Sequence, residues 1–100
     1  MRLENKVAAI LGGGSELALT VGKLLLKEGS SLVLIDSSLD YFKNTLNLLE
    51  EWKDRITIYA ADVDSQTEVD RALEYIVKEY KKIDIIVNCT GTLKNWRHCQ

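Results

Sequence analysis

The sequence contains no proline and only two cysteines, Cys89 and Cys99, among its 100 residues. Two cysteines are too few for the disulfide framework of a small secreted domain, so a reducing, intracellular setting is expected. No apolar run approaches the ~20 residues of a membrane span, and residues 1–6 are too polar to begin a signal peptide. These absences predict a cytoplasmic protein that does not enter a membrane.

The sequence also lacks a strong excess or a cluster of charges of one sign. The chain carries 13 Lys and Arg against 15 Asp and Glu, which gives a net charge of -2. Because the basic residues are scattered rather than clustered, the sequence argues against a nucleic-acid surface. A hydrophobic content of 46% is typical of one ordinary globular domain with a single core.

Apolar runs and amphipathic segments alternate along the chain. Runs rich in apolar residues, typical of buried strands, occupy residues 6–11, 32–35, 56–60 and 83–87. Helical periodicity follows the first three runs, over about residues 15–28, 39–53 and 65–81. The short connections predict an α/β fold with a doubly wound parallel sheet, strand order 3-2-1-4, and helices on both faces.

A glycine-rich turn, Gly12, Gly13 and Gly14, separates the first strand from the first helix. Glycine permits a tight reversal that brings backbone N–H groups close to a ligand. A helix that begins at Ser15 or Glu16 presents unpaired N–H donors and the positive end of its dipole, which together favour a phosphate. A purely structural turn between strand and helix is the alternative interpretation.

Polar residues follow each of the other strands, where a parallel sheet places its ligand crevice. Asp36 lies 24 residues after Gly12, near the ~20-residue spacing at which an acidic group binds a ribose 2′-OH. A solvated loop residue or a helix cap explains Asp36 equally well. If a dinucleotide binds, Asp36 favours NAD over NADP, because a 2′-phosphate would meet a carboxylate without a compensating cation at Gly13 or Ser37.

Four motifs give the chain a recognisable pattern: LGGGSELA at 11–18, VLID at 33–36, ADV at 61–63 and IDIIVNCTG at 83–91. With them, residues 3–92 resemble the amino-terminal, Rossmann-like half of the short-chain dehydrogenase/reductase family. The resemblance implies an NAD(H)-binding portion of an oxidoreductase. It assigns the pyrophosphate to Gly12 and the backbone of Ser15, Glu16 and Leu17, the adenosine ribose to Asp36, the adenine to Asp62 and Val63, and the floor of the site to Asn88 and Gly91.

Three residues of the turn depart from the family's T-G-x-x-x-G-x-G pattern. Leu11 stands for the threonine, Glu16 for the second glycine and Ala18 for the third. Ala18 is small enough to preserve close packing of helix on strand. Glu16 places a carboxylate at the helix N-terminus, where it either turns outward or satisfies the N–H groups itself and repels a diphosphate. The inward alternative predicts a non-catalytic, self-associating module with a disabled cofactor site.

The family's catalytic residues have no counterpart in this sequence. The catalytic serine and the Y-x-x-x-K pair lie on later elements of the family, and none of Tyr41, Tyr59, Tyr75 and Tyr80 is followed by lysine four residues on. We therefore assign no catalytic residue and expect the chain alone to be inactive. A flavodoxin-like or receiver-like domain is disfavoured, because a receiver needs acidic residues where the glycine turn stands.

The last residues, 92–100, lose the apolar periodicity and look unlike the family's continuation. They divide the chain into a half-domain at 1–91 and a polar, frayed tail. This change suggests a truncated or frameshifted product, a hypothesis that an intact mass above that of this chain would contradict. Cys89, His98 and Cys99 make only a weak metal set, because two are adjacent and a fourth ligand is lacking, so no metal is assigned.

The fourth strand is expected at an edge of the sheet. Residues 83–87 are almost entirely apolar, and an apolar edge is a template for pairing with another chain. We therefore predict a homodimer through strand 83–87. The alternative surface is the outer face of helix 39–53, with Tyr41, Leu48 and Trp52.

Overall fold

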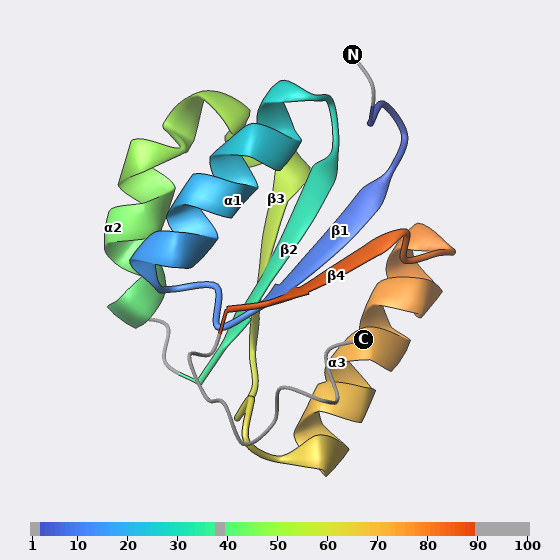
Figure 1. Ribbon diagram of the computed structural model, residues 1–100. Helices are drawn as coiled ribbons and strands as arrows, with labels where there is room; N and C mark the ends of the chain where they lie inside the picture. The colour runs from blue at the N-terminus through green and yellow to red at the C-terminus, as the bar shows by residue number, and fades with distance from the viewer. Residues whose placement is uncertain (1–2, 38–39, 90–100) are drawn as a thin grey trace.

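A computed structural model describes residues 3–37 and 40–89 of the chain, apart from the side chains of Tyr41 and Asn44. The described part forms four strands and three α-helices, with one 3-10 helix, in the expected alternation (Figure 1). The strands are β1 (Val7–Leu11), β2 (Ser31–Asp36), β3 (Ile56–Ala60) and β4 (Ile85–Asn88), and the helices are α1 (Glu16–Lys27), α2 (Asp40–Leu48), η1 (Glu50–Arg55) and α3 (Gln66–Tyr80).

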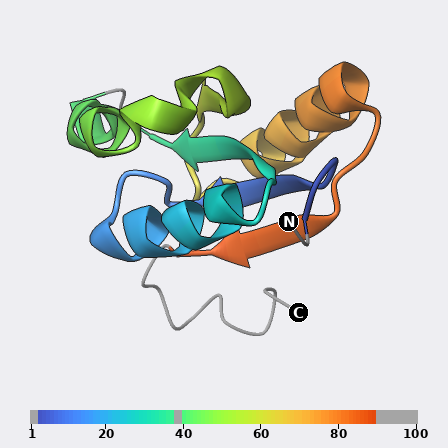
Figure 2. The same cartoon turned by 90° about the horizontal axis from the view of Figure 1, so that it is seen from above.

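All the strand pairings are parallel, and the strand order is β3-β2-β1-β4, which confirms the predicted topology. Ala9, at the centre of β1, aligns with Val33 of β2 on one side and with Ile86 of β4 on the other. Helices α1 and α2 lie on one face of the sheet and α3 lies on the opposite face (Figures 1 and 2). The carboxyl ends of the strands therefore gather at one end of the molecule.

Side-chain caps fix the starts of two helices. Ser15 precedes α1 and its Oγ accepts a hydrogen bond from the Ala18 N–H at 3.1 Å. Ser65 precedes α3 and its Oγ accepts from the Glu68 N–H at 3.3 Å. No helix within the described ranges is both long enough and apolar enough to cross a membrane.

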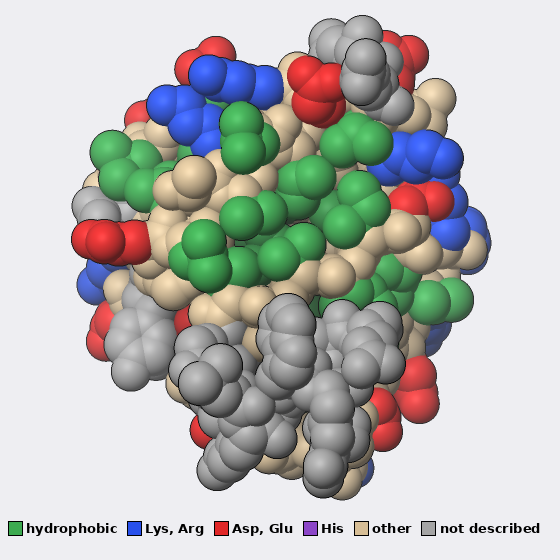
Figure 3. Space-filling model, viewed as in Figure 1, with side chains coloured by type: hydrophobic (Ala, Val, Ile, Leu, Met, Phe, Trp, Pro, Cys, Tyr) green, Lys and Arg blue, Asp and Glu red, His purple; other side chains and the backbone are tan. Residues whose placement is uncertain are grey.

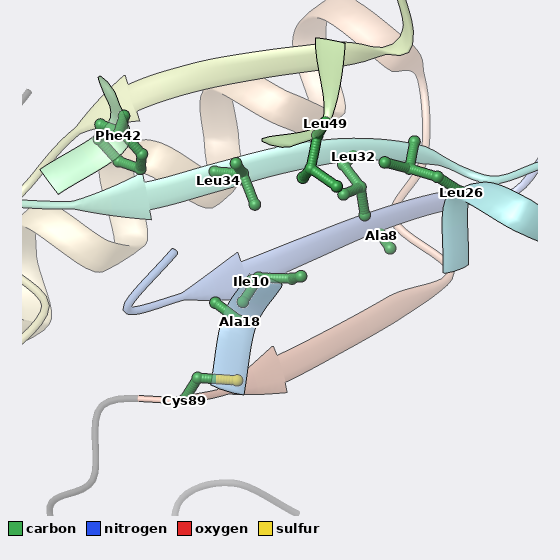
Figure 4. Packing of buried hydrophobic residues seen from close by; sticks show 9 residues of the cluster. All are labelled: Ala8, Ile10, Ala18, Leu26, Leu32, Leu34, Phe42, Leu49 and Cys89. Carbon is green, nitrogen blue, oxygen red and sulfur yellow. The ribbon is translucent and has the colours of Figure 1, made fainter. Parts of the chain in front are cut away.

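The core consists of two apolar clusters, one on each face of the sheet. The first lies between the sheet and helices α1 and α2 (Figure 4), and its buried members are Ala8, Ile10, Ala18, Leu26, Leu32, Leu34, Phe42, Leu49 and Cys89. The second lies under α3 and contains Val7, Ala9, Val33, Ile35, Ala61, Ala72 and Ile76. Alternate residues of β1 and β2 thus point to opposite clusters, which explains their continuous apolar sequence.

The prediction of one helix over residues 39–53 is wrong. Helix α2 ends at Leu48, and a separate 3-10 helix covers Glu50–Arg55. Trp52 within it has non-helical angles, φ -112° and ψ 15°, and its ring packs against the first cluster. The expected outer face of this helix therefore loses Trp52, and the side chain of Tyr41 lies outside the described part of the chain.

Candidate functional site

The glycine turn is attached to the carboxyl end of β2. The N–H groups of Gly12 and Gly13 both donate to the Ile35 carbonyl, at 2.8 and 2.9 Å. Gly12 has φ 81°, in the left-handed region that favours glycine. A Cβ atom on Gly13 would lie 2.7 Å from Leu34 Cβ, so the turn also needs a glycine there to approach β2 closely. Part of the glycine pattern is therefore structural.

Asp36, the last residue of β2, connects this turn to the loop that follows the strand. Its Oδ2 accepts a hydrogen bond from the Gly14 N–H at 3.0 Å, and its Oδ1 accepts from the Ser37 N–H at 2.8 Å. The residue is buried, so it is not a solvated loop residue. A carboxylate offers about four acceptor positions. Two positions therefore remain for donors from a ligand, such as ribose hydroxyls.

The N-terminus of α1 keeps free donors beside Asp36. Ser15, rather than Glu16, caps the helix, because the Ser15 Oγ accepts the hydrogen bond of the Ala18 N–H. The N–H groups of Glu16 and Leu17 donate to no acceptor in the described part of the chain. The Glu16 side chain is exposed and accepts none of the hydrogen bonds among the described residues. These two N–H groups and the helix dipole suit a phosphate.

Asp62 and Val63 follow β3, whose last residue, Ala60, aligns with Asp36. Asp62 is exposed, and its Oδ1 accepts a hydrogen bond from the Asp64 N–H at 2.9 Å. Val63 is half-buried and packs against the second cluster. The contacts of both residues are explained by the loop itself, so their role at an adenine stays a prediction.

Asn88 ends β4 and aligns with Leu11, directly before the glycine turn. The next residue, Cys89, donates its N–H to the Leu11 carbonyl at 2.7 Å, and its side chain lies near Ala18 in the first cluster (Figure 4). Burial raises the pKa of the Cys89 thiol, which makes it a poor nucleophile at neutral pH. Gly91, and the His98 and Cys99 of the weak metal set, lie outside the described residues.

The structure thus places eight of the nine predicted site residues at one end of the sheet. Gly12, Ser15, Glu16, Leu17 and Asp36 surround one turn, and Asp62, Val63 and Asn88 lie at the ends of the flanking strands. Sequence reasoning did not identify Gly14 as the donor that holds the Asp36 carboxylate. The spacing between two motifs predicts that they are near each other, but it does not say which backbone atom makes the contact.

A parallel sheet with this strand order, a glycine turn after β1 and an acidic residue after β2 defines a dinucleotide-binding type of fold. Comparison with known proteins gives the particular family. The family model of the short chain dehydrogenases matches residues 6–99, so the chain belongs to this family. The match extends through residue 99, so the expectation that the segment after Gly91 departs from the family pattern is not supported.

Individual relatives agree with this assignment. Short-chain dehydrogenase reductase 3c of Arabidopsis thaliana is 30% identical over 94 residues, which cover 94% of this chain and 36% of the plant protein. The NADH-complexed 3-ketoacyl-(acyl-carrier-protein) reductase of Brucella melitensis has a TM-score of 0.72 at 31% identity, over 84% of this chain and 33% of that one.

The 2-keto-3-deoxy-D-gluconate dehydrogenase of Streptococcus agalactiae has the same fold, with a TM-score of 0.79 at 22% identity, over 93% of this chain and 35% of that chain. The chain therefore spans roughly a third of the length of the proteins it matches, 36% of the plant relative and 33% of the Brucella enzyme. It corresponds to the amino-terminal part of a short-chain dehydrogenase.

Proposed function

We propose that this chain binds NAD(H) and forms the cofactor-binding portion of a short-chain dehydrogenase. The observation that carries the proposal is the position of the Asp36 carboxylate. Gly14 and Ser37 hold it at the end of β2, directly beside the helix N-terminus whose Glu16 and Leu17 N–H groups lack acceptors among the described residues. A dinucleotide needs both features, one for its ribose and one for its pyrophosphate.

Each part of the proposed site has a defined task. The Glu16 and Leu17 N–H groups bind the pyrophosphate, and Asp36 accepts hydrogen bonds from the adenosine ribose. Asp62 and Val63 border the adenine, while Asn88 lines the floor of the site beside the adenosine and nicotinamide halves. When bound, the nicotinamide supplies hydride transfer. The chain's own residues bind and orient the cofactor.

The same geometry favours NAD over NADP. A 2′-phosphate on the adenosine ribose would approach the Asp36 carboxylate, whose two fixed N–H partners hold it in place. Ser37 cannot compensate with charge, and its N–H already donates to Asp36. The negative charges of the 2′-phosphate and of the Asp36 carboxylate repel each other, which disfavours NADP. The NADH complex of the Brucella relative supports the same preference.

Calorimetric titration of the chain with NADH and NADPH tests the proposal. We expect NADH to bind and NADPH to bind at least ~10-fold more weakly. The Asp36→Asn variant replaces one acceptor oxygen by a donor and should weaken NADH binding about 10-fold, the cost of a charged hydrogen bond. Asp54→Asn, at an exposed position in η1, is the matched control and should leave the affinity unchanged.

Failure of wild type to bind NADH at millimolar concentration would contradict the proposal. The second candidate is a self-associating module with a disabled cofactor site. The observation behind it is the place of Glu16 in the first turn of α1, beside the N–H groups that would bind the phosphate, although the Glu16 side chain is exposed and accepts none of the hydrogen bonds among the described residues. A Glu16→Gly arm of the same titration separates the two candidates. If NADH binds to the Glu16→Gly variant and not to wild type, the second candidate is correct, because the Glu16 side chain then prevents cofactor binding.

A further inference from the structure

The loop between β3 and α3 is closed by a side chain of the helix. Glu68, in the first turn of α3, accepts a hydrogen bond from the Asp62 N–H at 3.0 Å through its Oε1. In an ordinary capping box the glutamate accepts from the N–H of the capping residue, which here is Ser65. The Ser65 N–H instead donates to the Asp62 carbonyl at 3.0 Å. Glu68 therefore reaches past the cap and ties α3 to the chain that leaves β3.

The other end of this loop is attached to Asp36. The Ala61 N–H donates to the Asp36 carbonyl at 2.9 Å, so the loop starts beside the residue proposed to bind the adenosine ribose. Figure 1 shows the loop at the end of the molecule where β2 and β3 terminate. Within the loop, Asp62 Oδ1 accepts from the Asp64 N–H at 2.9 Å. The Asp62 N–H, carbonyl and Oδ1 atom are thus all engaged by neighbouring residues.

Two polar groups of the loop have no partner within the described part of the chain. They are the Oδ2 atom of Asp62, which accepts hydrogen bonds, and the N–H group of Val63, which donates one. The Watson–Crick edge of adenine offers the opposite pair, a donor at N6 and an acceptor at N1. Hypoxanthine reverses both, with an acceptor at O6 and a donor at N1. The two free groups of the loop therefore suit adenine and not hypoxanthine.

We propose that Glu68 is a positioning residue for adenine recognition, because its hold on the Asp62 N–H fixes the loop that carries Asp62 Oδ2 and the Val63 N–H. The inference rests on the proposed function, in which Asp62 and Val63 border the adenine. Without the Glu68 carboxylate the loop loses its tie to the helix side chain, and its two free groups must be ordered when the base binds. That ordering lowers the affinity for a base that needs both groups.

A purely structural role for Glu68 is the alternative. An acidic residue in the first turn and a basic residue in the last turn suit the helix dipole, and α3 has Glu68 and Lys78 at these places. Figure 3 shows basic side chains beside the C-terminal end of α3 and acidic side chains lower along the same side of the molecule. A dipole role changes the stability of α3 but not the preference for one base over another. The preference between two cofactors that differ only in the base is therefore the informative quantity.

Calorimetric titration of the whole chain with NADH and with reduced nicotinamide hypoxanthine dinucleotide measures this preference. The two dinucleotides share both riboses, the pyrophosphate and the nicotinamide. We expect wild type to bind NADH about 10-fold more tightly, because the hypoxanthine leaves both loop groups without partners. Glu68→Ala should weaken NADH binding about fivefold and leave the affinity for the hypoxanthine analogue nearly unchanged, so that the preference falls to about twofold.

Two further variants separate positioning from helix stability. Glu68→Gln removes the charge that suits the dipole but keeps an Oε1 acceptor for the Asp62 N–H, so it should retain most of the preference for NADH. Glu74→Ala, at an exposed position of the same helix, is the matched control and should retain all of it. Amide hydrogen exchange at Asp62 should become faster in Glu68→Ala and not in the other two variants. Circular dichroism checks that α3 remains folded in each.

Each contrary outcome rejects a different step. A wild-type chain that binds neither dinucleotide rejects the proposed function, and the role of Glu68 with it. Equal binding of both dinucleotides by wild type keeps the cofactor site but rejects recognition of the base by Asp62 and Val63. A full preference for NADH in Glu68→Ala leaves Glu68 with its dipole role alone. A preference that Glu68→Gln loses as completely as Glu68→Ala shows that the charge, rather than the accepted hydrogen bond, is what matters, and this also rejects the proposal.

Discussion

Two glycines in contact with β2 differ in what a side chain would meet at each position. A Cβ atom on Gly13 would lie 2.7 Å from Leu34 Cβ and 3.0 Å from Leu34 Cα, so backbone atoms would have to move. A Cβ atom on Gly22 would lie 3.0 Å from Leu32 Cδ1, the end of a flexible side chain. The first contact cannot relax locally, whereas the second can.

Gly13→Ala should therefore destabilise the chain by about 1–3 kcal/mol, the range of overpacking in a close contact. Gly22→Ala in the interior of α1 gains helix propensity of up to ~1 kcal/mol and should be neutral or stabilising. Urea unfolding followed by circular dichroism measures both changes. Equal effects at the two positions would contradict the distinction between backbone and side-chain neighbours.

At the scale of elements, the segment after α2 shows where sequence reasoning failed. The apolar residues Leu46, Leu49 and Trp52 lie in α2, in the turn after it and in η1, respectively. The helical period of the sequence nevertheless predicts one continuous helix over 39–53. In the structure Leu49 is buried, and Trp52, whose backbone angles are non-helical, packs against the first cluster. Sequence periodicity thus did not locate the end of α2.

Arg55, at the end of η1, joins this element to the C-terminal end of α1. Its Nη2 donates to the Leu26 carbonyl and its Nη1 donates to the Ser30 carbonyl, both at 3.0 Å. Arg55→Met keeps most of the aliphatic stem but removes both donors, and should cost about 1–3 kcal/mol. Urea unfolding of this variant measures the loss. Lys53→Met, an exposed position in the same element, is the control, and an equal loss there would refute the role of the two hydrogen bonds.

For the molecule as a whole, the type and order of the elements other than η1 could be predicted from the sequence, because apolar runs and helical periodicity report burial directly. The strand order followed from the alternation of strands and helices through the chirality and adjacency rules of parallel sheets. The contacts that position the site could not be predicted from the sequence. The bond from the Gly14 N–H to Asp36 links two segments that are 22 residues apart, and no local pattern encodes such a contact.

Two reciprocal hydrogen bonds link Asp84, directly before β4, to Val7, the first residue of β1. The Val7 N–H donates to Asp84 Oδ2 at 2.8 Å, across 77 residues of sequence, and the Asp84 N–H donates to the Val7 carbonyl at 2.8 Å. The Val7 hydrogen bond, aided by the Lys82 ammonium 3.2 Å away, holds the pKa of Asp84 below its ordinary value of 3.8. The ionised carboxylate thus ties the first strand to the last.

Linkage gives this contact a defined pH dependence. Because the folded pKa is lower than the unfolded pKa, the stabilisation by Asp84 is fully present above about pH 5 and is lost as the pH falls through the folded pKa. Asp84→Asn, which removes the charge, should therefore lower the urea midpoint at neutral pH. The difference from wild type should shrink steadily below the ordinary pKa of 3.8.

Urea unfolding at a series of pH values measures that difference, with Asp54→Asn as the control because Asp54 is exposed in η1. The control should follow the wild-type curve at every pH. A difference between Asp84→Asn and wild type that stays constant down to about pH 2 would show that the hydrogen-bond geometry, rather than the ionised form, provides the stabilisation. A difference that shrinks with acid would instead make Asp84 one of the carboxylates whose protonation begins acid unfolding, by releasing β4 from β1.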